Sequence, residues 1–151
     1  MANTQAMCTS FKTEMLNGIH AFGTTVIRAG TTKDSFKAAL YLTSATVNAS
    51  TTVYAVGGEV SGTGYTAGGE DVTFATPPTS TGTTAFVTPS ASIVYSGVTL
   101  ATAFDAVLIY NSTQGNKAVS VHQFTSQTIT SGTLTLTMPT NDASFALIRL
   151  A

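Results

Sequence analysis

The feature that most constrains the fold of this chain is a series of short apolar segments separated by residues that favour turns. Residues 133–138 read T-L-T-L-T-M, a strict alternation of polar and apolar side chains. Alternation with a period of two is typical of a strand with one buried face. Thr is also β-branched, which favours the pleated surface of a sheet. The pattern therefore predicts a protein built from strands.

Similar segments follow one another along the chain, with turn-forming residues between them and no helical stretch separating them. This arrangement argues against a parallel βαβ fold. Many short strands at near-regular spacing favour an all-β fold, an antiparallel β-sandwich or barrel, and a jelly roll is one sandwich that fits. The expected strands cover residues 36–42, 72–74, 85–87, 92–95, 98–100, 105–110, 118–124, 127–130, 134–138 and 145–150.

The N-terminal residues carry a different pattern, with an apolar side chain at every fourth position. The residues of this stripe are Met7, Phe11, Met15 and Ile19. Such a stripe predicts an amphipathic helix. We expect a helix or arm over residues 1–22 and a single β-sandwich domain over residues 23–151. The helix either covers one end of the sheet core or packs as an arm on a neighbouring subunit.

The charge content excludes several classes of protein. Only 9% of the 151 residues are charged, against about 25% in average proteins, and the net charge is −1. The six Lys and Arg residues form no cluster, so we expect no direct binding of nucleic acid. No apolar run approaches the ~20 residues of a membrane helix. Low charge also suits a protein that spends its life inside an assembly, because solubility normally depends on net charge.

The single cysteine, Cys8, cannot form an intramolecular disulfide. The N-terminus carries no charged segment followed by an apolar one, so we expect no secretory signal. Both observations fit a protein made in the cytoplasm.

Residues that could support catalysis are few. His122 could form a triad with Asp105 and one of many serines, but the sequence has no G-x-S-x-G nucleophile elbow. We therefore expect no enzyme and no catalytic residues.

Residues that could bind a metal or cofactor are equally sparse. A weak Ca²⁺ site would need carboxylates to converge from Glu59, Glu70, Asp71 and Asp142, whereas solvated loop charges are the simpler interpretation. The glycines at 62–69 match neither G-x-G-x-x-G nor a P-loop. We expect neither a cofactor nor a metal.

Three stretches together resemble a family of small tailed-bacteriophage virion proteins. They begin F36-K-A-A-L-Y-L-T-S-A, G58-E-V-S-G-T-G-Y-T-A-G-G and F104-D-A-V-L-I-Y-N-S-T-Q-G-N-K. The resemblance runs from about Phe36 to Leu150, and the Gly-rich element is its most specific part. The chain departs from the family where Tyr95 stands in place of a common Trp.

The resemblance implies an all-β structural protein present in many copies and bound to other virion proteins. The best single expectation is a capsid decoration, or cement, protein on the capsid exterior, made in the host bacterial cytoplasm. It would bind the major capsid protein, stabilise the shell and form a homo-oligomer, a trimer or a dimer. The alternatives are a head–tail joining or tail-associated structural protein and a host-glycan or receptor-binding module. The expected partner contacts are Met7, Phe11, Met15, Glu59 and Tyr65.

Overall fold

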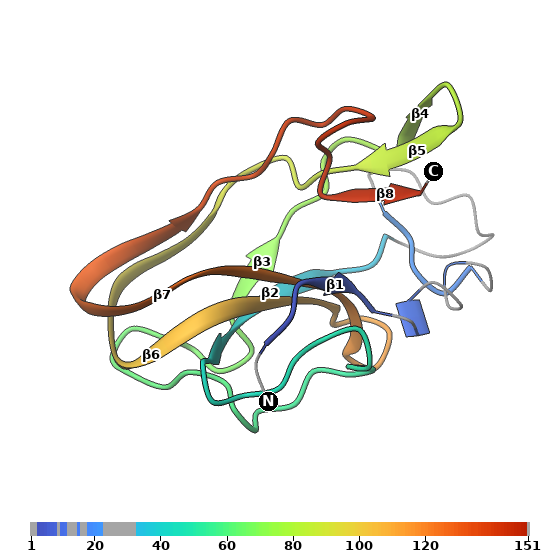
Figure 1. The fold of residues 1–151 in the computed structure, drawn as a ribbon. Coiled ribbons are helices and arrows are strands. Elements are labelled where there is room, and N and C mark those ends of the chain that lie inside the picture. The colour runs from blue at the N-terminus through green and yellow to red at the C-terminus, as the bar shows by residue number, and fades with distance from the viewer. Residues whose placement is uncertain (1–2, 9, 12–14, 16–17, 23–32, 151) are drawn as a thin grey trace.

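The computed structural model describes residues 3–8, 10–11, 15, 18–22 and 33–150. The described chain is all-β, with antiparallel pairing throughout. The strands are β1 (Ala6–Met7), β2 (Phe36–Leu42), β3 (Glu70–Val72), β4 (Thr79–Thr81), β5 (Thr84–Val87), β6 (Ile93–Asn111), β7 (Lys117–Leu136) and β8 (Ile148–Leu150). They form one sheet in the order β1-β7-β6-β2-β3 and a second sheet in the order β4-β5-β8 (Figure 1).

Two long strands, β6 and β7, dominate the first sheet. They form one hairpin, in which Asn111 pairs with Lys117 next to the turn and Ile93 pairs with Leu136 at the far end. Several expected short strands are therefore parts of these two. The sequence pattern predicts them as separate short strands because the pairing register shifts repeatedly between Tyr95 and Ala106, and each shift breaks the alternation of buried and exposed side chains.

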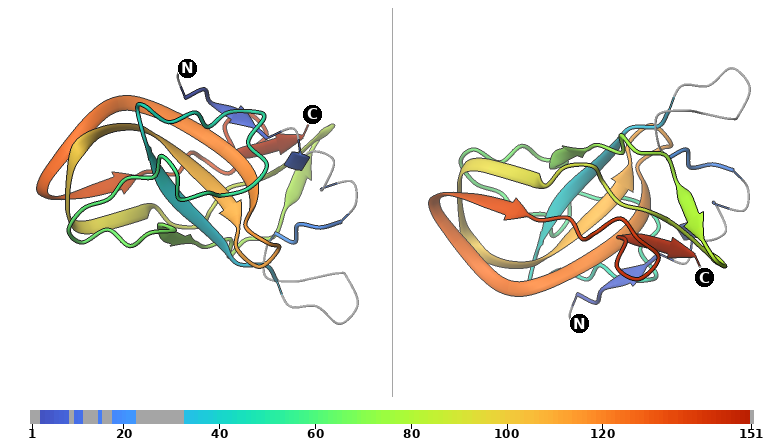
Figure 2. Two further views of the ribbon diagram at one scale, coloured as in Figure 1. Left: turned by 90° about the horizontal axis from the view of Figure 1, so that it is seen from below. Right: turned by 90° about the horizontal axis from the view of Figure 1, so that it is seen from above.

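The β6–β7 hairpin bends back over its own sheet, as Figures 1 and 2 show. The half of β6 that is nearer the β6–β7 turn, from Phe104 to Asn111, pairs with β2. We call this the near half of the strand, and the half that begins at Ile93 the far half. The far half returns across β2, where the Tyr95 hydroxyl donates a hydrogen bond to the Ala38 carbonyl at 2.7 Å. The same two strands thus line the core from two sides.

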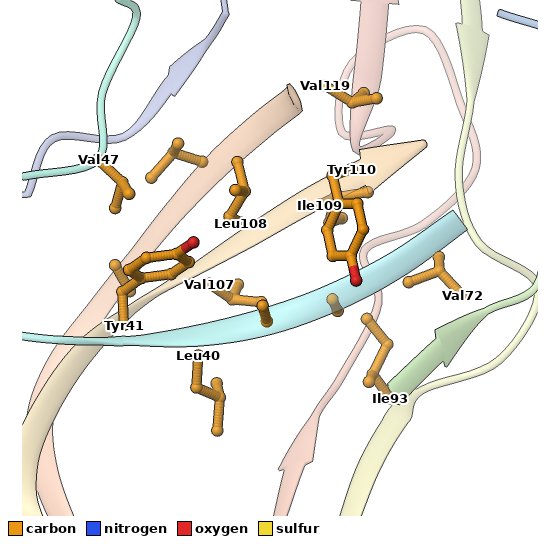
Figure 3. Packing of buried hydrophobic residues seen from close by; sticks show 14 of the residues in the cluster. Leu40, Tyr41, Val47, Val72, Ile93, Val107, Leu108, Ile109, Tyr110 and Val119 are labelled. Carbon is orange, nitrogen blue, oxygen red and sulfur yellow. The ribbon is translucent and has the colours of Figure 1, made fainter. Parts of the chain in front are cut away.

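The core lies on both faces of the first sheet. In Figure 3, Leu40 and Ile93 lie on one side of β2, and Tyr41 and Val47 lie on the other. All four are buried. A central strand buried on both faces explains why F-K-A-A-L-Y-L reads as an almost continuous apolar run.

The helix predicted over residues 1–22 is not seen. Ala6–Met7 is a strand that pairs with Ser120 and Val121 of β7. Gly18 has a φ of 66°, in the left-handed region that ends a helix. Helical backbone is assigned only at Ser10, Phe11 and Met15 among the described residues. Among the described residues of this segment, Phe11 and Phe22 are buried in the core, and Met7 and Met15 pack against it.

Candidate functional site

The Gly-rich loop between β2 and β3 wraps around the outer edge of β2. The Leu42 N–H donates to the Gly58 carbonyl, and the Val60 N–H donates to the Leu40 carbonyl, at 2.9 and 3.0 Å. Farther along, the Thr99 N–H of β6 donates to the Thr63 carbonyl at 2.9 Å. The loop therefore occupies the edge of β2 that lies beyond the short strand β3.

Glycine is needed in this loop because the backbones approach closely. A Cβ on Gly69 would lie 1.7 Å from the Ala38 carbonyl oxygen, and one on Gly62 would lie 2.0 Å from the Thr99 carbonyl oxygen. Gly69 also has a φ of 74°. Any side chain at these two positions would push the loop away from the sheet.

Glu59 holds the loop in place through its buried carboxylate. The Tyr65 hydroxyl and the Gly68 N–H donate to one carboxylate oxygen at 2.7 and 2.8 Å. The Tyr54 hydroxyl donates to the other oxygen at 2.7 Å. Glu59 is only 7% exposed, so these three donors replace the water that a carboxylate requires.

All five tyrosines of the chain gather around this carboxylate, and we call them and Glu59 the tyrosine cluster. Tyr54 stacks on Tyr110 with ring centroids 4.6 Å apart, and Tyr65 stacks on Tyr95 at 5.9 Å. The Tyr110 hydroxyl donates to the Gly68 carbonyl at 2.9 Å. The Tyr41 hydroxyl donates to the Ala55 carbonyl at 2.5 Å. The Tyr95 hydroxyl joins β6 to β2, and each of the other four joins the Gly-rich loop to the sheet or to the carboxylate.

Burial keeps these hydroxyls protonated. Desolvation raises the pKa of Tyr41 to about 12. It also raises the pKa of Tyr54 and of Tyr65, and the hydrogen bond that each donates to Glu59 raises the pKa further. Burial likewise raises the pKa of Tyr95 and of Tyr110. The tyrosine cluster is therefore a set of hydroxyl donors around one carboxylate, and it joins the Gly-rich loop and β6 to β2.

Glu59 and Tyr65, two of the expected partner contacts, thus lie side by side and bind each other. Their polar atoms are engaged within the chain, which assigns them a structural role in the loop. Their binding to a partner stays a prediction.

The other three expected contacts lie in the N-terminal segment, close to the core. Phe11 is fully buried, with its ring edge-on to His20 at 4.8 Å and to Phe22 at 5.9 Å. Met7 and Met15 are half-buried and pack against the core. The described part of the segment therefore covers its own sheet, which is the first of the two roles expected for it. Contact between Met7, Phe11 or Met15 and a neighbouring subunit stays a prediction.

A buried polar cluster beside this segment was missed by the sequence analysis. The Asn111 amide donates to Asp34 Oδ2 at 2.8 Å and lies 3.0 Å from His20 Nδ1. The Gln114 amide donates to Asp34 Oδ1, and the Ala21 N–H donates to Asp34 Oδ2, both at 3.0 Å. The cluster joins residues 20–21 to the β6–β7 turn. Its members are scattered in sequence, so no local pattern indicates it.

His122 does not form the triad considered from the sequence. Its Nε2 atom lies 2.9 Å from Ser120 Oγ, two residues away on the same strand. Asp105 instead accepts a hydrogen bond from the Asn3 amide at 2.6 Å. Burial lowers the pKa of His122 to about 4, so the ring is neutral at physiological pH. A cavity of about 570 Å³ beside it has Met7, Phe145 and Arg149 in its lining.

The acids considered for a Ca²⁺ site also have other partners. Asp71 forms an ion pair with Lys37 at 2.9 Å, and Asp142 Oδ1 accepts from the N–H groups of Ser144 and Phe145. Within the described residues, no three His, Cys, Asp or Glu side chains are grouped so that they could hold a metal ion. Over the same residues, no helix has the length and apolar character needed to span a membrane.

The most distinctive surface belongs to two long spans of the chain without charged side chains, with Arg149 of β8 beside Phe86 of β5 at its margin. No Lys, Arg, Asp or Glu occurs in residues 72–104 or 118–141. These spans contain β4, β5, the far half of β6 and most of β7, and β6 pairs with β7 along its length. The exposed side chains there are mostly Thr, Ser and Gln. We call this surface the uncharged half.

Several charged residues lie together at the other end. Lys37 and Asp71 form an ion pair between β2 and β3, and Asp34 precedes β2. Lys117 pairs with Asn111 at the turn of the hairpin, and Asn111 in turn pairs with Phe36 at the start of β2. These charged residues therefore lie near the turn end of the β6–β7 hairpin, opposite the end where Ile93 pairs with Leu136.

Comparison of the chain with protein-family models, with curated proteins and with solved structures finds no match.

Proposed function

We propose that this chain is a structural protein of a tailed-phage virion, and specifically a decoration protein. It binds the major capsid protein on the outside of the shell and stabilises the shell. The observation that carries the proposal is the uncharged half, and the resemblance of the Gly-rich element to phage virion proteins supports it. The proposal includes a two-layer β-sandwich, supported by the doubled-back β6–β7 hairpin, with a jelly-roll-like connection.

The uncharged half suits burial against another protein. Removing a charged side chain from water costs several kcal/mol unless a partner compensates it. Hydroxyl and amide groups cost less and can form hydrogen bonds across a joint. The cores of protein interfaces are depleted of charge for this reason. Thr side chains on strands also hold their rotamers, so little side-chain entropy is lost on binding.

The rigid loops fit the same role. The tyrosine cluster fixes the Gly-rich loop through one carboxylate and three donors. A preorganised surface loses little entropy on docking. Many joints of about 1,600 Å² each, repeated over a shell, would raise the free energy needed to rupture it. No chemical step is required of the protein.

The test is to mix the purified chain with capsids stripped of it and to count bound copies by quantitative gel and cryo-electron microscopy. Hundreds of copies spread over the shell are the expected result. A few copies at one vertex would assign the chain to the neck or tail instead. No binding, together with saturable binding to host polysaccharide, would favour the receptor-binding alternative.

A matched pair of variants tests the role of the uncharged half. Thr102 lies exposed in this half on β6, whereas Ser50 lies exposed in the loop after β2. Thr102→Glu is expected to lower occupancy on the capsid, because it adds a charge where the joint forms. Ser50→Glu adds the same charge outside this half and is expected to leave occupancy unchanged. Equal occupancy for both variants would contradict the proposed contact surface.

A further inference from the structure

The two edges of the five-stranded sheet are protected very differently. At one edge, β3 has three residues, two of which are the acids Glu70 and Asp71. Short edge strands and charged side chains are the usual means by which proteins prevent unwanted strand pairing. The Gly-rich loop covers the rest of that side.

The other edge is the outer side of β7, and most of it has no such protection. β1 covers only Ser120 and Val121. Beyond them, no described strand pairs with this side of β7. Residues 123–130 read Q-F-T-S-Q-T-I-T, with no charge and no proline. Six of these residues are exposed, and Phe124 and Ile129 are half-buried. We call residues 123–130 the open edge.

The backbone of the open edge is oriented for pairing. The Cys8 N–H donates to the Val119 carbonyl at 3.1 Å, so Val119 directs its polar groups outward. Because these groups alternate in direction along a regular strand, those of Gln123 also face outward. Between Gln123 and Gln127 the register with β6 shifts, and no described strand pairs with the outer side of this stretch. The open edge ends near Ser131, whose φ of 50° interrupts the regular strand.

A mostly apolar cavity lies next to this edge, between the two halves of the hairpin. Its volume is about 300 Å³. It is lined by His122 and Phe124 from the near half of β7 and by Leu136 from the far half, with Ile93 and Val107 of β6 among the other lining residues. Phe124 also packs edge-on to Phe104, at 5.8 Å. The space between the layers is therefore incompletely filled on the β7 side.

We propose that two copies of this chain pair through their open edges, antiparallel and about a two-fold axis. Each copy then satisfies the outward backbone groups of the other and places a second Phe124 beside the cavity. A copy fits because identical strands about a two-fold axis oppose like residues, and this strand has no charge that would face its own kind.

This pairing rests on the proposed function, because it names the surface through which the proposed virion protein would self-associate. Its test needs no capsid, so its failure is separate from a failure of capsid binding.

The experiment is sedimentation of the full chain over a range of concentrations. Thr125 is exposed, and its side chain would lie near that of the other copy, directly opposite or diagonal to it. Thr125→Glu and Thr125→Lys are each expected to raise the dimer Kd at least tenfold. A one-to-one mixture of the two variants is expected to restore dimers, because Glu then opposes Lys. Circular dichroism confirms that each variant is folded.

The matched controls are Thr83→Glu and Thr83→Lys, at an exposed turn between β4 and β5. They are expected to leave the dimer Kd unchanged. The inference is overturned by a wild-type chain that sediments as a monomer at every concentration. It is also overturned by an oligomer that the Thr125 variants do not weaken, or by a mixture that stays monomeric.

Discussion

Replacing Glu59 tests the central claim that one buried carboxylate holds the Gly-rich loop. In Glu59→Ala, three donors lose their acceptor: the hydroxyls of Tyr54 and Tyr65 and the Gly68 N–H. Tyr54 and Tyr65 are both half-buried, but the Tyr65 hydroxyl also accepts from the N–H of the fully buried Leu40 and so lies deeper than that of Tyr54. The Tyr65 hydroxyl and the buried Gly68 N–H are therefore the two donors that lose a partner which water does not readily replace. Each buried donor left unsatisfied costs about 1–3 kcal/mol, and the relief of burying a carboxylate offsets part of this. We expect the free energy of unfolding to fall by about 3 kcal/mol.

Glu59→Gln separates the shape of this side chain from its charge. The amide oxygen can still accept from Tyr65 and Gly68, and the amide nitrogen can donate to the Tyr54 hydroxyl. Only the strengthening of these bonds by the negative charge is lost, so we expect a decrease of about 1 kcal/mol. The matched control is Glu70→Ala, which removes a carboxylate from the edge strand β3 and should stay within about 1 kcal/mol of wild type.

The assay is urea denaturation, followed by circular dichroism and by tyrosine fluorescence, which no Trp obscures. A domain of this size has a free energy of unfolding of about 5–15 kcal/mol, so a loss of this magnitude is measurable. The reasoning fails if Glu59→Ala unfolds within 1 kcal/mol of wild type. It also fails if Glu59→Gln is as damaging as Glu59→Ala, because the shape of the acceptor would then not matter.

Three further results are expected. Gly69→Ala should lower the free energy of unfolding by more than about 3 kcal/mol, because the added Cβ would overlap the Ala38 carbonyl. The control is Gly82→Ala, which is also at positive φ but has open space around it. It should cost only about 1–2 kcal/mol in the same denaturation assay. The pKa of Tyr41 is about 12 in the folded chain and near 10 in the unfolded chain. The stability that the buried neutral hydroxyl contributes should therefore be complete below pH 10 and fall as the pH rises toward 12, and tyrosinate absorbance should increase as the chain unfolds. A free energy of unfolding that is constant across this window would contradict the reasoning. Phe11→Ala should lower the free energy of unfolding by about 3–5 kcal/mol through loss of a fully buried ring, and a loss below about 1 kcal/mol would show that this ring does not belong to the core.

The antiparallel all-β class could be predicted because Thr-rich alternation is a local signal. Residues 36–42 were expected as a strand and form β2 with the same bounds. Long strands were harder to predict, because Gly97 and Ser131, both at positive φ, interrupt the alternation within β6 and β7. The short strands β1 and β4 carry too few residues for a pattern.

The candidate sites were less predictable than the strands, for a physical reason. The sequence predicts Glu59 and Tyr65 as partner contacts, and in the structure they instead bind each other at 2.7 Å, which spacing in the sequence does not indicate. Their burial depends on Tyr54 and on the close approach of Gly69 to Ala38, which are tertiary facts. A helical stripe was inferred from spacing alone, yet Met7 lies in a strand because β7 offers it a pairing partner more than a hundred residues away.

That pairing has a consequence for synthesis on the ribosome. Ala6 and Met7 pair with Val121 and Ser120, so β1 has no pairing partner until more than a hundred further residues have been made. At about 5–20 residues per second, the delay is on the order of ten seconds. During this time Phe11 and Cys8, which are fully buried in the finished fold, remain exposed to solvent and to other nascent chains. Rapid closure of the local β6–β7 hairpin then supplies the surface on which the waiting segment docks.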